Sequence, residues 1–364
     1  MNPGISITST FAVAREFDLP GRVGNVRPHG RGLINDTYVV DLENAATPHA
    51  ILQRISRRAF PRPDLIMENL STLFAHAEAH AGRSDLLFPF IYRTRSGALL
   101  HIDEEGSAWR AMSYIEGTRS HHRPQHPGHA REAGRILGRF HALLFDLDPS
   151  RMHDTRPDFH NTPRHLARLN DALAQAEPSR LKNAAPWLDF IDERRSRADL
   201  IERALVAGTI RPQVVHGDPK LDNVLFDAER DVAVSLIDLD TVKPGVIHHD
   251  IADCLRSCCN RAGEAGTEGE VAYELEMCSA GLAGYFEAAG DAARSIRTTD
   301  LFAALHLIPF ELGVRFLADH LAGDRYFRID YPGQNLARAA TQLQLSLDVE
   351  RKRAPIEDQI EALL

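Results

Sequence analysis

Lysine is scarce in this chain of 364 residues, although lysine and arginine together occupy 42 positions. The lysines begin only at the midpoint of the sequence, at Lys182, Lys220, Lys243 and Lys352. Because no lysine precedes position 182, the sequence excludes a nucleotide site that depends on a lysine in an N-terminal strand. Glutamine or arginine would have to fill that place.

Cysteine is also rare, and its spacing excludes common metal and redox motifs. The four cysteines, Cys254, Cys258, Cys259 and Cys278, crowd one region without CxxC spacing. We expect them to be reduced and packed in the interior, in a reducing compartment. The cytoplasm is the expected location.

Three further absences bear on partners. No uninterrupted apolar run is long enough to cross a bilayer, and the first six residues lack the basic start and apolar segment of a signal peptide. A net charge of −9 offers no basic footprint for nucleic acid. We therefore expect neither a membrane nor a nucleic-acid partner, while the oligomeric state stays open.

The most informative feature that is present is the segment His216-Gly217-Asp218-Pro219-Lys220-Leu221-Asp222-Asn223. Lys220 and Asn223 follow Asp218 by two and five residues, and apolar runs flank the segment on both sides. Kinase catalytic loops separate a base Asp and a metal-binding Asn by the same five residues. Asp238 follows a second apolar run, Val232–Ile237. This combination predicts phosphoryl transfer rather than an ordinary turn between two strands.

Phosphoryl transfer explains why these residue types occur together. Asp218 would orient an acceptor hydroxyl and take its proton, and Lys220 would add positive charge where the moving group is most negative. The amide oxygen of Asn223 and the carboxylate of Asp238 are hard ligands that suit Mg²⁺. We expect His216 to brace the loop by hydrogen bonding.

The chain length and its 43% hydrophobic residues suit two lobes. Arg27–Leu42 predicts two strands around a glycine-containing turn, and Ala50–Ile55 predicts a third. Asp64–His80 has helical spacing, with Asp64 as its N-cap. Further elements are expected as a helix at Thr10–Phe17 and strands at Leu99–Ile102 and Ala108–Ile115.

From about residue 117 onward the apolar spacing is mainly helical. His129–Leu144 is strongly amphipathic, and helices are expected at 163–175, 190–206, 248–260, 269–289, 300–322 and 335–362. We predict an α+β, kinase-like fold with two lobes. Residues 1–116 would form a nucleotide-binding lobe of antiparallel strands with one helix, and residues 117–364 a larger, mainly helical lobe with the catalytic and acceptor sites.

The nucleotide end is predicted from the first strands. Gly30 and Gly32 lie in a turn where backbone N–H groups can approach phosphates. Asn35 and Thr37 alternate along the return strand and would point toward the nucleotide. Alternation admits only Gln53 or Arg54 to this face, and we favour Gln53 because Ile51 and Ile55 would share it. Glu68 on the following helix is a candidate partner for Gln53 or a charged neighbour of it, and it could equally be a solvated helix residue.

Two other residue groups have competing interpretations. Arg315 lies among apolar residues on a helix, where it would contact substrate or form an ion pair with Glu311 or Asp319. His76 and His80 are one helical turn apart. Without a third ligand nearby, they are more typical of a solvated helix face than of a zinc site.

These residues resemble the aminoglycoside phosphotransferase and choline kinase superfamily, whose hallmark is an HGDxxxxN loop, an ID[WL][ED] strand and a later Asp, here Asp250. Within it the chain is similar to the N-acetylhexosamine 1-kinases, which are anomeric sugar kinases. The similar segments span nearly the whole chain: Gly32–Tyr38, Ile51–Ile55, Phe159–Pro163, Ile237–Thr241 with Pro244-Gly245, Gly313–Asp319, Tyr326-Phe327 and Tyr331–Leu336.

The resemblance implies Asp218 as the base, Asn223 and Asp238 as metal ligands, and Arg315 as a sugar-pocket residue. It also implies that a strand lysine is not required. Two positions depart from the family pattern: Leu33 stands where the family has a histidine, and Ser257 stands where it has an aromatic residue. Both positions are associated with the sugar pocket, so the identity of the sugar is left open.

The leading hypothesis is a kinase that uses ATP and Mg²⁺ to phosphorylate a small molecule. A sugar is the expected acceptor, and the resemblance points to the anomeric hydroxyl of a hexose or N-acetylhexosamine. The alternatives are a kinase of an amino alcohol or aminoglycoside, such as homoserine or choline, and a nucleotide-binding protein of pseudokinase type. Intact Asp218, Asn223 and Asp238 argue against the last. The preference for ATP over GTP is not decided by the sequence.

Overall fold

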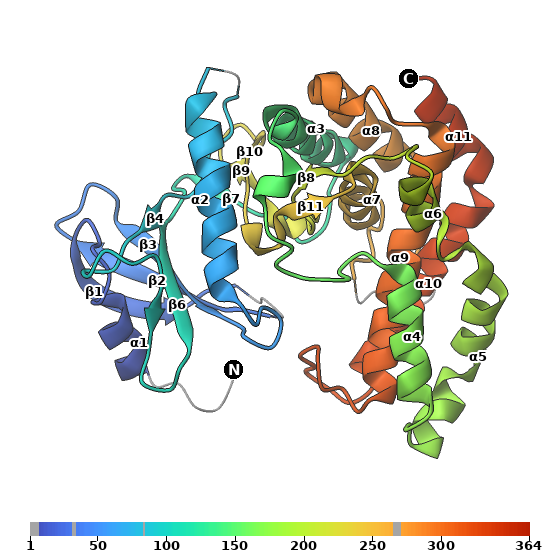
Figure 1. Ribbon diagram of the computed structural model, residues 1–364, viewed down its shortest axis with the longest axis horizontal. Helices are drawn as coiled ribbons and strands as arrows, with labels where there is room; N and C mark the ends of the chain where they lie inside the picture. The colour runs from blue at the N-terminus through green and yellow to red at the C-terminus, as the bar shows by residue number, and fades with distance from the viewer. Residues whose placement is uncertain (1–6, 31–33, 83, 265–270) are drawn as a thin grey trace.

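The structure is a computed structural model that describes residues 7–30, 34–82, 84–264 and 271–364. Its N-terminal lobe is built on an antiparallel sheet with the strand order β1-β2-β3-β6-β4, and β5 also pairs with β6 (Figure 1). The strands are β1 (Arg22–Pro28), β2 (Asp36–Glu43), β3 (His49–Ile55), β4 (Ile91–Tyr92), β5 (His101–Ile102) and β6 (Ala108–Ser113).

Alternation of side chains gives this sheet two different faces. One face packs with α1 (Ile7–Ala14) in an apolar cluster that includes Phe17, Leu52 and Trp109. Gln53 pairs directly across the strands with Thr37 on one side and Arg110 on the other. These three polar side chains therefore share the opposite face of the sheet.

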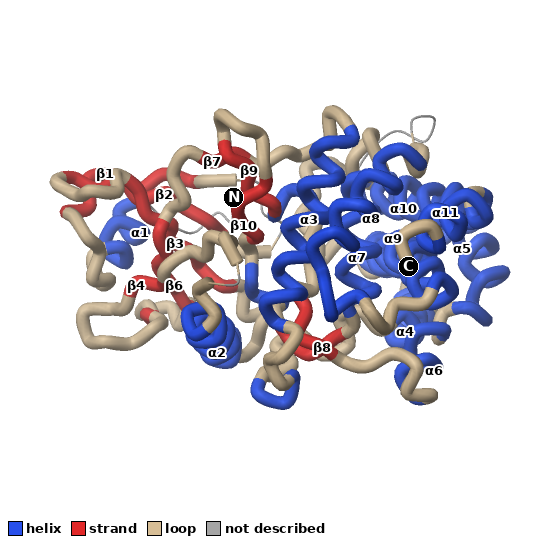
Figure 2. The backbone as a smooth tube through the Cα atoms, turned by 90° about the horizontal axis from the view of Figure 1, so that it is seen from above, coloured by secondary structure: helices blue, strands red, loops and turns tan. Residues whose placement is uncertain are grey.

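The second helix, α2 (Pro63–Ala79), lies between the sheet and the helical lobe (Figures 1 and 2). Pro63 occupies its first turn, where a missing N–H costs nothing. The prediction that Asp64 caps this helix was wrong. Arg62 holds the N-cap position without a capping hydrogen bond from its side chain, and its guanidinium instead donates to the Asp64 carboxylate.

The C-terminal lobe is mainly helical, as expected, and forms the opposite half of the molecule in Figure 2. The expected helix at 190–206 is instead split between α5 and α6, and that at 335–362 between α10 and α11. The helices are α3 (Pro127–Leu144), α4 (Thr162–Leu173), α5 (Pro178–Arg194), α6 (Leu200–Val206), α7 (Ile247–Cys258), α8 (Leu275–Ala289), α9 (Thr298–Leu321), α10 (Gln334–Arg351) and α11 (Arg353–Glu361).

Helices α3 and α8 approach each other so closely that only glycine fits at their crossing. A Cβ atom on Gly134 would lie 2.0 Å from the Gly281 carbonyl oxygen. Helix α9 is long and apolar enough to cross a membrane by length and composition alone, but 78% of its most apolar window is buried within the protein. It serves as a central helix of the lobe, packed against α4, α7 and α10.

Short strands at the start of the C-terminal lobe carry the predicted catalytic segments. β8 (Gln213–Val215) pairs with β11 (Lys243–Gly245), and β9 (Val224–Asp227) pairs with β10 (Ala233–Leu236) and β7 (Thr118–Arg119). The four cysteines are free and buried, as expected. The α+β, kinase-like fold with an antiparallel N-terminal sheet and a helical C-terminal lobe is confirmed.

Candidate active site

The loop between β8 and β9 brings the predicted catalytic residues together. The Lys220 ammonium donates to Asp218 Oδ2 at 2.9 Å. The Asn223 amide donates to the Asp218 carbonyl oxygen at 2.7 Å and to Oδ2 at 3.3 Å. One carboxylate therefore organises the whole loop.

His216 braces this loop from behind, as the sequence predicted. Its Nδ1 accepts from the Asp218 N–H at 3.3 Å, so Nε2 carries the proton and donates to the Ile237 carbonyl at 3.1 Å. Burial lowers the pKa of His216, which keeps the ring neutral. The histidine thus ties the Asp218 loop to the strand that precedes Asp238.

The side chain of Asp250 holds the backbone of the same loop. Its carboxylate accepts from the N–H groups of His216 at 2.7 Å and Gly217 at 2.9 Å, and from His141 Nε2 at 3.0 Å. Burial alone would raise the pKa of this carboxyl, but the His141 bond and the loop donors outweigh it and lower the pKa. Gly217 has a φ of 87°, and a Cβ there would lie 2.6 Å from the Thr241 carbonyl oxygen, so this position requires glycine.

Asp218 is held as a carboxylate. Burial alone would raise its pKa, but the neighbouring Lys220 ammonium outweighs burial and lowers it. Burial alone would lower the pKa of Lys220. The Asp218 carboxylate outweighs burial and raises this pKa well above its usual value. An ionised base with a fixed cation beside it suits attack by a hydroxyl group on a phosphoryl group.

Asp238 differs from Asp218 because its carboxylate has no hydrogen bond or ion pair with any residue that the structure describes. The residue follows β10, is exposed to solvent and has a φ of 63°, in the left-handed region. The surrounding protein, followed by the charges of Asp240 and Asp218, raises the pKa of this carboxyl to about 6. A strained backbone and crowded carboxylates are features that ligand sites maintain.

The donor set of Asp238 and Asn223 fits a hard divalent cation. The Asn223 carbonyl accepts from the Ile237 N–H at 2.9 Å, which fixes Asn223 next to the residue before Asp238. Because the Asn223 amide nitrogen bonds to Asp218, its Oδ1 is the atom left for a ligand, and it accepts no bond within the described ranges. An amide oxygen and a carboxylate match the preferences of Mg²⁺.

On the N-terminal lobe, Gln53 occupies the face that was predicted for it. Its Nε2 donates to Thr37 Oγ1 at 2.9 Å, and its Oε1 accepts from Arg110 Nε and Nη2 at 3.0 and 2.7 Å. Arg54 lies on the other face, where it pairs with Asp36 and stands 6.0 Å from the centre of the Trp109 ring. The glutamine thus meets a cation that the sequence interpretation missed.

Arg110 and Asp240 form a buried ion pair between the lobes. Arg110 Nη2 lies 2.5 Å from Asp240 Oδ1, and the two side chains are 1% and 2% exposed. Asn35 Nδ2 donates to Asp240 Oδ2 at 2.8 Å, and Asn35 Oδ1 accepts from the Ser56 N–H at 2.9 Å. Asn35 therefore joins the two lobes. An arginine among apolar residues in a strand, and a second acid after Asp238, were the signals available in the sequence.

The turn at the front of the lobe is only partly described. Gly30 has a φ of 72° and open space around it, so its glycine serves backbone conformation rather than packing. Gly32 and Leu33 lie outside the described residues. Of the alternatives for Glu68, the structure favours a solvated helix residue: its side chain is 59% exposed and its carboxylate lies 2.7 Å from His153 Nε2, with no bond to Gln53.

Arg315, on α9, forms neither of the ion pairs considered for it. Glu311 accepts from His160 Nδ1 at 3.2 Å and Thr162 Oγ1 at 3.0 Å. Asp319 accepts from the backbone N–H groups of residues 325 to 327 and from Asn335. Ser257 is also engaged, since its hydroxyl accepts from the Leu221 N–H at 2.8 Å and supports the catalytic loop.

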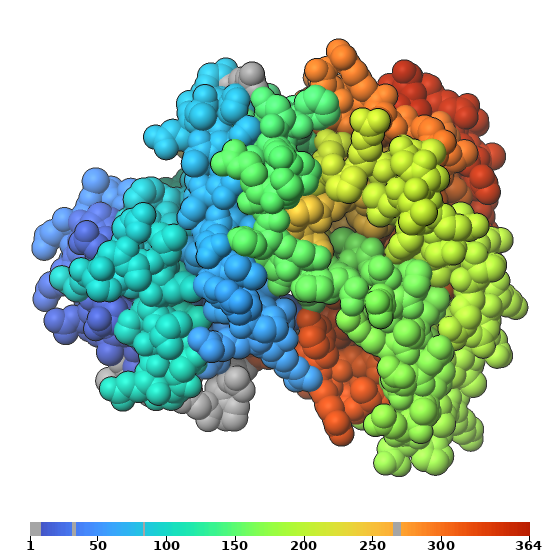
Figure 3. All heavy atoms as spheres, in the orientation of Figure 1, coloured from blue at the N-terminus to red at the C-terminus, as the bar shows by residue number. Residues whose placement is uncertain are grey.

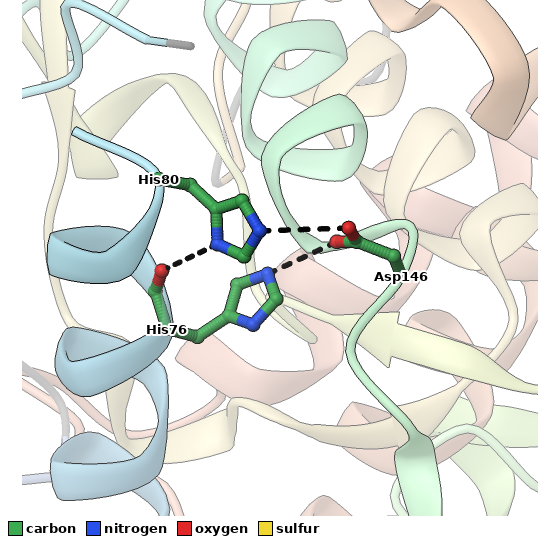
Figure 4. A group of neighbouring side chains, drawn as sticks. All are labelled: His76, His80 and Asp146. Carbon is green, nitrogen blue, oxygen red and sulfur yellow. Dashed lines mark hydrogen bonds and ion pairs between the residues drawn. The ribbon is translucent and has the colours of Figure 1, made fainter. Parts of the chain in front are cut away.

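The histidine pair on α2 is not a solvated face (Figure 4). His76 Nε2 lies 3.1 Å and His80 Nε2 3.6 Å from the two carboxylate oxygens of Asp146, a third group that the sequence interpretation missed. His76 Nε2 also lies 3.0 Å from the Leu143 carbonyl oxygen, which an N–H can bond and a metal-bound nitrogen cannot. The cluster is a clamp between α2 and the end of α3.

Comparison with known proteins adds a family match. Residues 25–288 match the model of the phosphotransferase enzyme family, and this range contains strands β2 to β11, most of β1 and the whole Asp218–Asp238 region.

Solved structures share the fold along nearly the full chain. An aminoglycoside phosphotransferase from Alicyclobacillus acidocaldarius subsp. acidocaldarius DSM 446 has a TM-score of 0.62 at 16% identity, over 100% of this chain and 98% of that one. A spectinomycin phosphotransferase in complex with ADP and spectinomycin has a TM-score of 0.61 at 12% identity, over 95% of this chain and 99% of that one. A choline kinase from Cryptosporidium parvum Iowa II has a TM-score of 0.60 at 13% identity, over 98% of this chain and 100% of that one.

Proposed function

The chain belongs to the phosphotransferase enzyme family, and from that premise we propose that it transfers the γ-phosphoryl group of ATP, with Mg²⁺, to a hydroxyl group of a sugar. The observation that carries the proposal is the single carboxylate of Asp218, bonded to Lys220 and Asn223 and adjacent to the unpaired Asp238. The resemblance to anomeric sugar kinases supports a sugar as the acceptor.

In this reaction the acceptor O–H bond breaks as its proton moves to Asp218. The acceptor oxygen forms a bond to the γ-phosphorus while the bond from phosphorus to the bridging oxygen of ADP breaks. Lys220 offsets the negative charge on the transferred group, and its bond to Asp218 keeps that base ionised. His216 and Asp250 fix the loop so that little reorganisation is needed.

Asn223 Oδ1 and the Asp238 carboxylate would hold the cation. When bound, Mg²⁺ neutralises charge that develops on the β- and γ-phosphate oxygens. Asp238 is the group best suited to it, because its neighbours Asp240 and Asp218 make an added positive charge favourable.

For the nucleotide we propose the sheet face that carries Thr37, Gln53 and Arg110, together with the turn at Gly30 and Gly32. Arg110 is the cation on this face, and Asp240 balances its charge. Its Nη1 is buried and has no hydrogen-bond partner within the described residues, so one donor is left for a phosphate. Asn35, which is bonded on both sides, supports this face.

A cationic acceptor, such as an amino alcohol or aminoglycoside, is the second candidate. The carboxylates of Asp218 and Asp238 favour it, since they lie close enough for the charge of Asp218 to raise the pKa of Asp238. The unpaired Arg315 weighs against it.

ADP release with ATP and Mg²⁺, measured over sugars, amino sugars, homoserine, choline and aminoglycosides, tests both candidates. Phosphorus NMR on any product gives the position of the phosphate. A sugar phosphate supports the proposal, and turnover of only the amino alcohols or aminoglycosides replaces it with the second candidate.

A further inference from the structure

Two arginines meet at one aromatic ring beside the catalytic loop. The Arg156 guanidinium carbon lies 4.1 Å from the centre of the Phe159 ring, and that of Arg315 lies 5.0 Å from the same centre. Arg315 is also 5.7 Å from the Phe327 ring. Phe159 is buried and both arginines are partly buried, so two like charges share one small, half-desolvated volume.

Neither arginine has a carboxylate partner in the part of the chain that the structure describes. Arg156 donates to the hydroxyl of Tyr326, and Arg315 makes no recorded hydrogen bond or ion pair there. The acids nearest in sequence are engaged elsewhere: Asp154 with Lys243 Nζ at 2.6 Å, and Glu311 with His160 and Thr162.

His160, the residue after Phe159, connects the arginine pair to the loop that carries Asp218. The rings of Phe159 and His160 lie 4.3 Å apart, and His160 Nε2 lies 2.8 Å from the Gly217 carbonyl oxygen, directly before Asp218. On the other side, Arg58 of the N-terminal lobe stands 5.7 Å from the Tyr326 ring and adds a third positive charge.

The charge balance of this place is unfavourable without a ligand. Burial, followed by the positive charge of Arg315, lowers the pKa of Arg156. A guanidinium out of water is stabilised chiefly by bidentate bonds to an oxyanion, and a second guanidinium beside it increases the need for one. Catalytic Asp218 does not meet that need, because Lys220 already pairs with it.

We propose that Arg156 and Arg315 form a subsite for an anionic oxygen group, a carboxylate or a phosphate, on the acceptor. The inference rests on the proposed function, because an acceptor hydroxyl at Asp218 places the rest of the acceptor beside these arginines. It predicts a sugar acid or sugar phosphate as the acceptor rather than a neutral or cationic molecule.

The first experiment measures the subsite without assuming an acceptor. Inorganic sulfate is titrated by calorimetry into protein saturated with Mg²⁺ and a non-hydrolysable ATP analogue, so that the phosphate positions of the nucleotide are filled. We expect Arg156→Gln and Arg315→Gln each to weaken sulfate binding about 10- to 100-fold. Arg353→Gln is the matched control, since Arg353 also stacks on a phenylalanine, Phe302, but pairs with Glu357 at the surface.

Equal sulfate binding by the wild type, Arg156→Gln and Arg315→Gln would overturn the inference. Weaker binding of the ATP analogue in these variants, with sulfate unchanged, would also overturn it and assign the arginines to the nucleotide. Thermal unfolding of each variant establishes that the fold is intact.

The second experiment uses acceptors with one ring and different charges: glucose, glucosamine, glucuronic acid and glucose 6-phosphate. We expect kcat/KM for the better of the two acids to exceed that for glucose about tenfold or more, and Arg315→Gln to remove most of this advantage. A preference for the carboxylate or for the phosphate identifies which anion the subsite takes.

The outcomes separate the inference from the proposed function. Turnover of glucose or glucosamine as fast as the acids, unaffected by either pair variant, leaves the sugar kinase standing and removes the anionic subsite. Sulfate binding that depends on the pair, with no turnover of any sugar, leaves the anionic subsite standing and removes the sugar as acceptor.

Discussion

Arg110 and Arg315 are both arginines inside the region between the lobes, but their surroundings differ. Arg110 is almost fully buried and donates to Gln53 while it pairs with Asp240, which Asn35 also bonds. Arg315 is only partly buried, contacts two aromatic rings and has no carboxylate in the described structure. One arginine is held by the protein, and the other is placed but left without a counter-charge.

The difference separates two uses of charge in one active-site region. A buried charge whose partner is supplied by the fold stabilises the arrangement of the lobes, and losing either partner is costly. A charge that the fold positions without an oppositely charged partner in the described structure, such as Arg315 or Asp238, is left for a ligand to pair with. Ligand sites can therefore be found by searching for positioned charges that lack partners.

Asp218 tests the limit of this comparison, because it is paired with Lys220 and is nevertheless the residue that we propose as the reacting base. We expect Asp218→Asn to lower kcat about 10³-fold, since the amide cannot take the acceptor proton. ADP release and calorimetric binding of Mg·ATP measure the two effects, with binding retained. An unchanged rate would show that the Asp218–Lys220 pair is structural, like Arg110–Asp240.

Arg110→Met tests the structural side of the comparison. Breaking the buried pair leaves Asp240 uncompensated, and we expect a loss of about 3–5 kcal/mol in the free energy of unfolding. Arg315→Met should leave this free energy nearly unchanged, because no carboxylate loses its partner. Urea unfolding of both variants measures the difference, and equal destabilisation would break the comparison.

Asp238→Asn tests the unpaired carboxylate. We expect the affinity for Mg²⁺ in the presence of nucleotide to fall about 10- to 100-fold, an effect of the size seen when metal sites lose supporting groups. Titration of Mg²⁺ at fixed ATP analogue measures it, with Asp222→Asn as a control on the exposed side of the same loop. A normal Mg²⁺ dependence would remove Asp238 from the proposed metal ligands.

His248, in the helical lobe, extends the comparison to a buried side chain that also lacks a partner in the described structure but is neutral, unlike Arg315 and Asp238. Neither ring nitrogen has a hydrogen-bond partner within the described residues, and burial lowers the pKa of His248 to about 4. Between the ordinary histidine pKa of about 6.5 and pH 4 the unfolded chain binds more protons, so stability falls as pH falls through this window.

We therefore expect His248→Leu to reduce the acid-induced drop in Tm between pH 6.5 and pH 4, while stability at pH 8 changes less. Thermal scans across this range measure the slope. His153→Gln, at an exposed histidine, is the control. An identical slope in His248→Leu and the wild type would contradict the assignment.

The sequence predicted what is local. The residues from His216 to Asn223 act within one loop, so their spacing was enough to predict a shared site, and alternation placed Gln53 on the inner face of β3 correctly. The two-lobed fold followed from strand and helix periodicities. Helix ends were less accurate, because the fold and not the N-cap residue sets the start of α2.

The rest depended on contacts between distant segments. Arg110 and Asp240 lie far apart in sequence, and nothing local shows that they pair. The bonds of Asn35 to Asp240 and Ser56 could not be predicted from its strand either, and its contact with the nucleotide stays a prediction. The absence of a partner for Arg315 could not be predicted either, since it depends on where Glu311 and Asp319 form their own bonds.

Asn69, a buried residue of α2, accepts from the His153 N–H at 2.8 Å and donates to the carbonyls of His153 and Val242 at 2.9 Å each. Three bonds to the C-terminal lobe thus converge on one side chain of a helix that flanks the sheet. In Figure 3, the blue segment that leads into α2 meets the orange-red segment after α9, and Arg58 of the first donates to the Arg325 carbonyl oxygen of the second. The bonds of Asn69 tie α2 to the C-terminal lobe, so a rotation of the sheet against that lobe would have to leave α2 with the helices or break those bonds.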